Sequence, residues 1–151
     1  MQRSIINQET IKLLILLMLF LVYESMTSIY YYLPPFFGAA FVLFIDIADR
    51  NNKYLLAPII AFLIFFEADK GYLFLSSVVF FYVSYRFVVP GIKNIIGCQK
   101  CLVPIFISYT YFGYHLFIQI VSVMFELPVN DFSLIMLYYV FVESLLILAL
   151  L

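Results

Sequence analysis

The chain contains no tryptophan, one histidine, two cysteines and five glycines among its 151 residues, and only 11% of them are charged. Two cysteines cannot build the disulfide framework of a small secreted domain, and a single histidine cannot supply both axial ligands of a haem. A net charge of −1 without a basic tract excludes nucleic-acid binding. So little charge also leaves too little polar surface to cover a soluble core.

Apolar residues are abundant instead. They make up 66% of the chain, against about 45–50% in soluble domains, and aromatic residues reach 21% through Phe and Tyr alone. Because a helix needs about 20 mostly apolar residues to cross a membrane, the sequence predicts a single integral membrane domain over residues 1–151, an all-α bundle of six transmembrane helices. We expect these helices at about 11–30, 34–49, 53–68, 72–89, 102–125 and 132–151. The second and third runs are short, so these helices span a thin region, tilt little, or extend into their polar flanks.

The charges that do occur are distributed unevenly between the two ends of these helices. Seven of the eight basic residues fall in alternate connections, which are expected to be cytoplasmic. They are Arg3, Lys12, Arg50, Lys53, Arg86, Lys93 and Lys100. The other end carries Lys70 and most of the acidic residues. The pattern predicts a multi-pass protein of the inner membrane with both termini in the cytoplasm.

Ionisable residues inside apolar runs are costly and therefore deserve a functional interpretation. Glu143 lies centrally in the sixth run, where it is expected to face the bundle interior as structural glue, a partner contact, or part of a proton or ion pathway. His115 lies in the middle of the fifth run and is expected to form an interhelical hydrogen bond. Asp46 and Arg50 are four residues apart, a spacing that predicts an ion pair on one helical face at the cytoplasmic end.

Motifs for enzymatic chemistry are absent from the sequence: there is no nucleophile elbow, phosphate-binding glycine loop or His-Glu-x-x-His zinc motif. Cys98 and Cys101 have the spacing that allows two thiolates to hold a metal or form a disulfide. A structural zinc site needs four ligands, so free thiols are expected, with a metal bridging two copies of the chain as the alternative. We therefore predict a non-catalytic protein without cofactor or metal.

The stretch from Leu33 to Lys93 combines a Pro34-Pro35 entry into a short apolar hairpin with an acidic turn, Glu67-Ala68-Asp69-Lys70-Gly71-Tyr72. This order resembles the MreD family of rod shape-determining proteins, small inner-membrane chains with a proline-bearing entry to helix two and an acidic residue at the end of helix three. On that resemblance Asp69 matches the acidic position of the family, and Tyr72 the small or aromatic position that follows it.

The resemblance implies a non-catalytic scaffold of the bacterial cell-elongation machinery, which directs peptidoglycan synthesis. Such a scaffold binds a bitopic MreC-like membrane protein and works with other cell-elongation proteins, surrounded by membrane lipid and with no small-molecule substrate. Candidate partner contacts in this chain are Glu67, Asp69, Tyr72 and Glu143.

An alternative function follows from the likeness of the family fold to the substrate-binding subunits of energy-coupling-factor vitamin transporters. In that interpretation the six helices enclose an outward-facing pocket for a cationic or hydroxylated small molecule. The rim of the pocket is then formed by Glu67, Asp69, Glu126 and Asp131. The first apolar run has none of the alanines through which such subunits dock their energising partner.

Overall fold

The computed structural model describes residues 15, 18–49, 56–126 and 133–150, and this part of the chain is all-helical. Its helices are, in chain order, Met18–Ile29, α2 (Phe37–Asp49), α3 (Leu56–Lys70), α4 (Ser76–Val83), the π-helical segment η2 (Ser84–Val88), α5 (Val89–Ile95), α6 (Gln99–Phe125) and α7 (Ile135–Leu150). Among the described helices, only α6 is long and apolar enough to cross a membrane alone, over Cys101–Phe125. The Met18–Ile29 helix and α7 are apolar but shorter.

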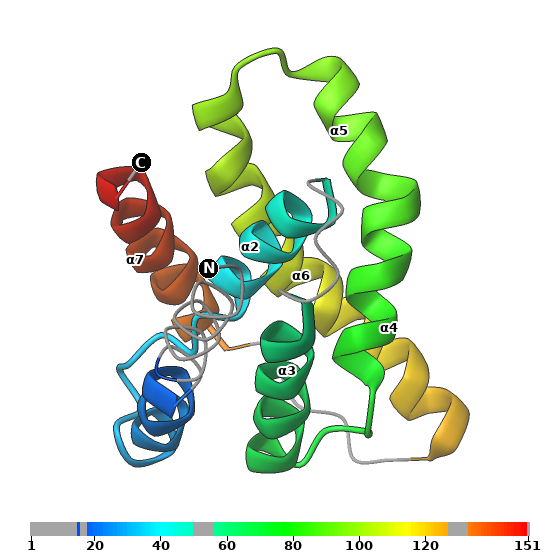
Figure 1. Ribbon diagram of the computed structural model, residues 1–151. Helices are drawn as coiled ribbons and strands as arrows, with labels where there is room; N and C mark the ends of the chain where they lie inside the picture. Colours follow the sequence, from blue (N-terminus) through cyan, green and yellow to red (C-terminus); the bar gives the residue numbers. More distant parts are fainter. Residues whose placement is uncertain (1–14, 16–17, 50–55, 127–132, 151) are drawn as a thin grey trace, which may run out of the picture.

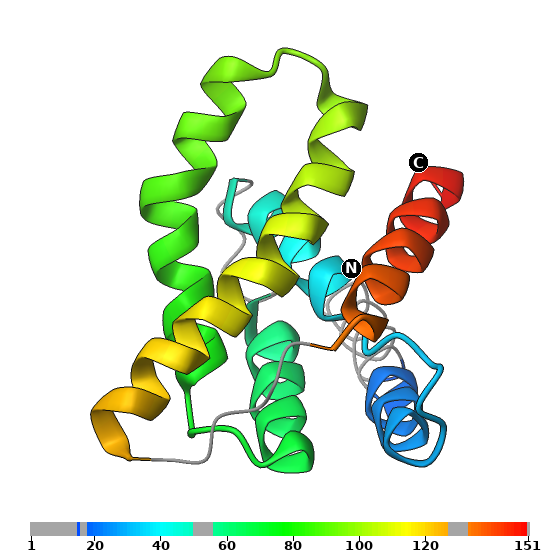
Figure 2. The same cartoon turned by 180° about the vertical axis from the view of Figure 1, so that it is seen from behind.

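Helix α6 packs against α2, α4 and α7, and α3 joins the bundle through contacts with α2 and α4. The connection between α5 and α6 and the C-terminal end of α7 lie at the top of Figure 1, whereas the α3–α4 connection lies at the bottom. The view from behind in Figure 2 preserves this order. The α3–α4 connection and the α5–α6 connection therefore lie at opposite ends of the bundle (Figures 1 and 2).

Aromatic rings fill the core. Phe37 from α2 stacks on Phe66 of α3 at 4.8 Å between ring centroids and lies 4.7 Å from the ring of Tyr114 in α6. Phe41 meets Phe81 of α4 edge to face at 4.9 Å. Each such pair contributes about 0.5–1.5 kcal/mol beyond the area that it buries. Contacts between aromatic rings thus hold α2, α3, α4 and α6 together in a chain that has only five glycines to allow close approach of helices.

The outward faces of the helices are also apolar. On α6, the side chains of Leu116, Ile120 and Val123 lie at helical spacing and are 59%, 63% and 74% exposed. Exposed apolar side chains likewise cover the outer faces of α7 and of the Met18–Ile29 helix. Large contiguous apolar surfaces of this kind mark contact with a membrane or a protein.

The fourth helix differs from its expected span of 72–89. It begins later, at Ser76, because Leu75 has a left-handed backbone with φ 65°. It also continues past Pro90 to Ile95 instead of ending in a loop. Proline removes one backbone donor and clashes with the carbonyl four residues earlier, and the wider π turn at Ser84–Val88 immediately before it accommodates this mismatch.

Candidate functional site

Glu67, at the end of α3, is fully buried and holds the N-terminus of α4. Its Oε2 accepts a hydrogen bond from the backbone N–H of Leu75 at 2.6 Å. Its Oε1 accepts bonds from the N–H and hydroxyl of Ser77 at 2.5 and 2.6 Å, and from the Ser76 hydroxyl at 3.1 Å. The first N–H groups of a helix have no partner within the helix, so Glu67 satisfies donors that α4 itself cannot.

Glu143, in α7, does the same for α2. Its Oε2 accepts the backbone N–H of Ala39 at 3.0 Å, and the Gly38 N–H also bonds to this carboxylate. The Tyr111 hydroxyl of α6 donates to its Oε1. Gly38 is required here, because an added Cβ would lie 2.8 Å from Glu143 Oε2. Phe36, which precedes α2, has a left-handed backbone with φ 52°, and Leu75, which precedes α4, has φ 65°. Both helices therefore start abruptly, and each takes a carboxylate from another helix as its cap.

A third buried carboxylate, Glu24, lies in the Met18–Ile29 helix and is fully inaccessible to solvent. Its Oε1 accepts a hydrogen bond from Thr27 Oγ1 at 3.3 Å, while its Oε2 has no partner among the described residues. Lys70 of α3 is close enough to interact with it electrostatically. The Met18–Ile29 helix is joined to the end of α3 beside this carboxylate by the contact of Lys70 Nζ with Thr27 Oγ1 at 3.4 Å.

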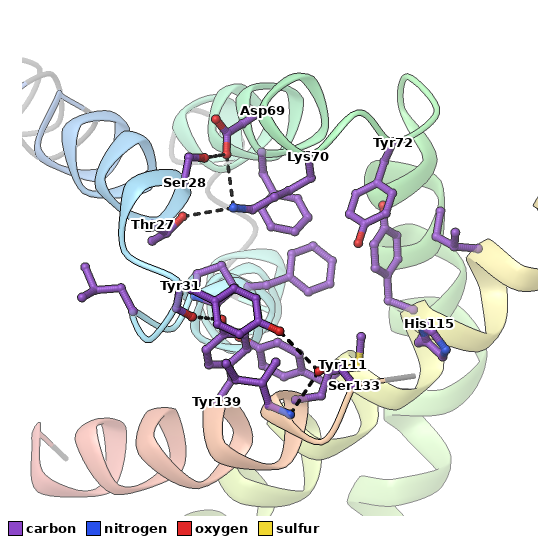
Figure 3. A pocket seen from close by; sticks show the side chains of 18 of the residues that line it. Thr27, Ser28, Tyr31, Asp69, Lys70, Tyr72, Tyr111, His115, Ser133 and Tyr139 are labelled. Atoms are coloured by element: carbon purple, nitrogen blue, oxygen red, sulfur yellow. Dashed lines mark hydrogen bonds and ion pairs between the residues drawn. The ribbon is translucent and has the colours of Figure 1, made fainter. Parts of the chain in front are cut away.

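A pocket of about 540 Å³ lies at the end of the bundle that carries the α3–α4 connection. Aromatic rings form much of its wall, as the close view in Figure 3 shows. They come from α2, α3, α6, α7 and the connections beside them: Tyr31, Phe37, Phe66, Tyr72, Tyr111, Tyr114 and Tyr139. A volume of this size falls within the ~300–1,000 Å³ range of small-molecule sites.

One side of the pocket rim carries paired charges. Ser28 donates a hydrogen bond to Asp69 Oδ2, and Lys70 Nζ lies 3.3 Å from the same oxygen. Lys70 Nζ also lies 3.4 Å from Thr27 Oγ1 (Figure 3). The positive and negative charges at this rim therefore offset one another, and the group joins α3 to the Met18–Ile29 helix.

The other sides of the rim are polar and uncharged. Tyr139 of α7 donates to the Tyr31 carbonyl at 2.5 Å, and the hydroxyls of Tyr31 and Ser133 lie 3.4 Å apart. Gln119 and His115 of α6 are hydrogen-bonded at 3.1 Å and face the pocket from a third side. The pocket thus offers an aromatic interior and a hydrogen-bonding edge.

The structure separates the four candidate partner contacts into two groups. Asp69 and Tyr72 line the pocket, whereas Glu67 and Glu143 are buried and bonded inside the bundle. Burial favours an internal role for both glutamates, because neither offers exposed surface to a partner.

The remaining candidates are dispersed. His115 is hydrogen-bonded to Gln119 of its own helix. Asp46 is exposed on α2, and its expected partner Arg50 lies outside the described residues. Of the four acidic residues expected at the rim, only Asp69 lines the pocket, since Glu67 is buried, Glu126 ends α6 and Asp131 lies outside the described residues.

Several pocket residues carried no signal in the sequence. In the sequence, Thr27 and Ser28 lie within an apolar run, and Lys70 lies in a short polar turn. Their interactions arise only because the end of α3 packs beside the Met18–Ile29 helix. In the sequence, Tyr111, Tyr114 and Tyr139 cannot be distinguished from other aromatic residues of membrane helices. Only the packing of segments about 40 to 110 positions apart brings these groups together.

Within the described ranges, no three His, Cys, Asp or Glu side chains are grouped as metal ligands, and the acidic groups nearest the pocket are engaged as helix caps or ion-paired. Comparison of the chain with protein-family models, curated proteins and solved structures finds no match in any of the three.

Proposed function

We propose that the chain is a multi-pass, non-catalytic scaffold of the bacterial inner membrane that acts in cell elongation, as its resemblance to the MreD family implies. The observation that carries this proposal is the placement of Asp69 and Tyr72. These two positions match the family pattern, and both line the rim of one pocket at one end of the bundle. A partner that meets the bundle at this end contacts both.

The distribution of side chains supports membrane insertion. The helices present large apolar residues outward and keep their carboxylates inside or at helix ends. With the basic α5–α6 connection in the cytoplasm, the pocket opens toward the periplasm. The bitopic MreC-like partner then crosses the membrane beside the apolar faces of α6 and α7, and its first periplasmic residues reach the pocket rim.

Co-purification of the MreC-like protein from the same cells tests the scaffold. We expect the tagged chain to retain this partner, and depletion of the chain to round the cells. Replacement of Asp69 by lysine should weaken the complex at least tenfold by reversing a charge at the rim. Glu126→Lys is the matched control, since it makes the same reversal at an exposed residue outside the pocket. Equal retention by both variants, or normal shape after depletion, contradicts the proposal.

The size and aromatic walls of the pocket favour a second candidate function, binding of a small molecule as in the substrate-binding subunits of vitamin transporters. The offset charges of Asp69 and Lys70 suit a neutral or zwitterionic planar ring with hydrogen-bonding edges rather than a strongly cationic ligand. Native mass spectrometry of the detergent-purified chain tests this function. A ring compound of stoichiometric mass that is lost in Tyr72→Ala, without a cell-shape phenotype on depletion, supports the transporter and contradicts the scaffold.

A further inference from the structure

Cys98 and Cys101 lie at the end of the bundle opposite the pocket, where α6 begins. Cys98 is the N-cap of α6, with an extended backbone at φ −90° and ψ 109°, and Cys101 follows in the first turn. Both side chains are exposed, and they are hydrogen-bonded to each other. The two sulfur atoms therefore already face one another at the surface.

Three features of this pair suit a thiophilic metal ion. The pair sits at the positive end of a 27-residue helix, where a negatively charged metal–thiolate group is electrostatically favoured. The Cys-x-x-Cys spacing, with both sulfurs on one side of a tight turn, is that of one half of a tetrahedral zinc site. The expected cytoplasmic location is reducing, so that such pairs serve metal binding more often than persistent disulfides.

One chain supplies only half of the ligands. A structural Zn²⁺ site requires four, and the described residues offer no third metal-binding side chain beside the pair. Copies of a membrane protein share one orientation, so a twofold axis along the membrane normal brings identical connections to the same height. The α5–α6 connection projects beyond the ends of α2 and α7 (Figures 1 and 2), which leaves it open to the equivalent connection of a second copy.

We propose that Cys98 and Cys101 of two copies together bind one Zn²⁺ as a tetrathiolate site that joins the chains as a dimer. Binding releases the four thiol protons and leaves a cluster of charge −2. The surroundings favour that charge, because the helix N-termini of both copies point at the site. The site lies at the opposite end from the pocket and adds a dimer contact to the proposed scaffold without depending on it.

The test uses the full chain, purified in detergent under anaerobic conditions with a non-thiol reductant and titrated with Zn²⁺ alone. Metal analysis should give one Zn²⁺ per two chains, and light scattering should show a dimer whose dissociation constant falls at least tenfold on Zn²⁺ addition. The variant C98S/C101S changes only two exposed atoms, so its helical circular dichroism should be unchanged, and it should bind no Zn²⁺ and remain monomeric.

Substitution of Co²⁺ for Zn²⁺ adds a spectroscopic readout, the visible absorption of tetrahedral cobalt thiolate, which is absent from the double variant. One metal per monomeric chain, an intrachain disulfide in place of metal binding, or equal Zn²⁺ retention by C98S/C101S overturns the proposal. Failure here is separable from failure of the scaffold, because the double variant should still retain the MreC-like partner.

Discussion

Removal of the Glu67 carboxylate is expected to destabilise the bundle by uncapping α4. In Glu67→Ala, the buried backbone N–H of Ser77 and the part-buried N–H of Leu75 lose their acceptors. A buried donor left without a partner costs about 1–3 kcal/mol, whereas the more exposed Leu75 N–H loses less, so we expect a total loss of about 1–4 kcal/mol. The serine hydroxyls contribute less, since Ser76 retains the Tyr114 hydroxyl at 2.9 Å. Side-chain hydrogen bonds in membrane proteins average only ~0.6 kcal/mol, so the backbone donors dominate.

Glu67→Gln separates the geometry of this cap from its charge. The amide keeps one oxygen for the serines but turns an NH₂ group toward the Leu75 N–H, so we expect a loss of about 1–3 kcal/mol. Glu126→Gln is the control at an exposed carboxylate. Because the chain has no tryptophan, unfolding in mixed micelles is followed by far-ultraviolet circular dichroism. A stability of Glu67→Ala within 0.5 kcal/mol of the unsubstituted chain refutes the capping role.

Three further predictions concern backbone space and sidedness. Gly38→Ala should cost about 1–3 kcal/mol by overpacking, since its Cβ would lie 2.7 Å from Ile107 Cγ2, whereas Gly91→Ala, with open space around it, should be neutral or stabilising in the same unfolding assay. Gly71→Ala should cost about 1–2 kcal/mol through its left-handed φ of 69° alone, and unchanged stability contradicts that strain. After bound metal is removed with a chelator, a membrane-impermeant maleimide should label Cys98 in inverted vesicles but not in intact cells, and the reverse pattern overturns the cytoplasmic assignment.

The apolar runs predict where α2, α3, α6 and α7 lie because length and hydropathy are local properties of the sequence. The course of the fourth helix could not be read in this way. Pro90 normally signals an end, yet the π turn before it lets the helix continue to Ile95. Whether a helix absorbs a proline depends on its neighbours, and the hydropathy pattern does not contain that information.

The candidate site was predictable only in its parts. The position of Glu143 in the middle of the sixth apolar run indicated that its side chain faces the interior. The sequence did not indicate its partner, because the Ala39 N–H that it accepts lies 104 positions away. The pocket likewise combines Ser28, Asp69 and Tyr139 from separate helices. Residue type and depth follow from the sequence, while the partner of each polar group follows from the order of helices around the bundle.

The Glu143 cap has a consequence for how the chain is made. Helix α2 emerges from the ribosome well before α7, which holds the carboxylate that completes its N-terminus, 104 positions after Ala39. Until α7 is present, the first N–H groups of α2 lack this carboxylate, so the earlier helices form before the cap of α2 is complete. Chains that terminate before α7 should therefore persist as open intermediates, which proteases recognise and remove. The cap thus makes synthesis of α7 a condition for stable assembly of α2.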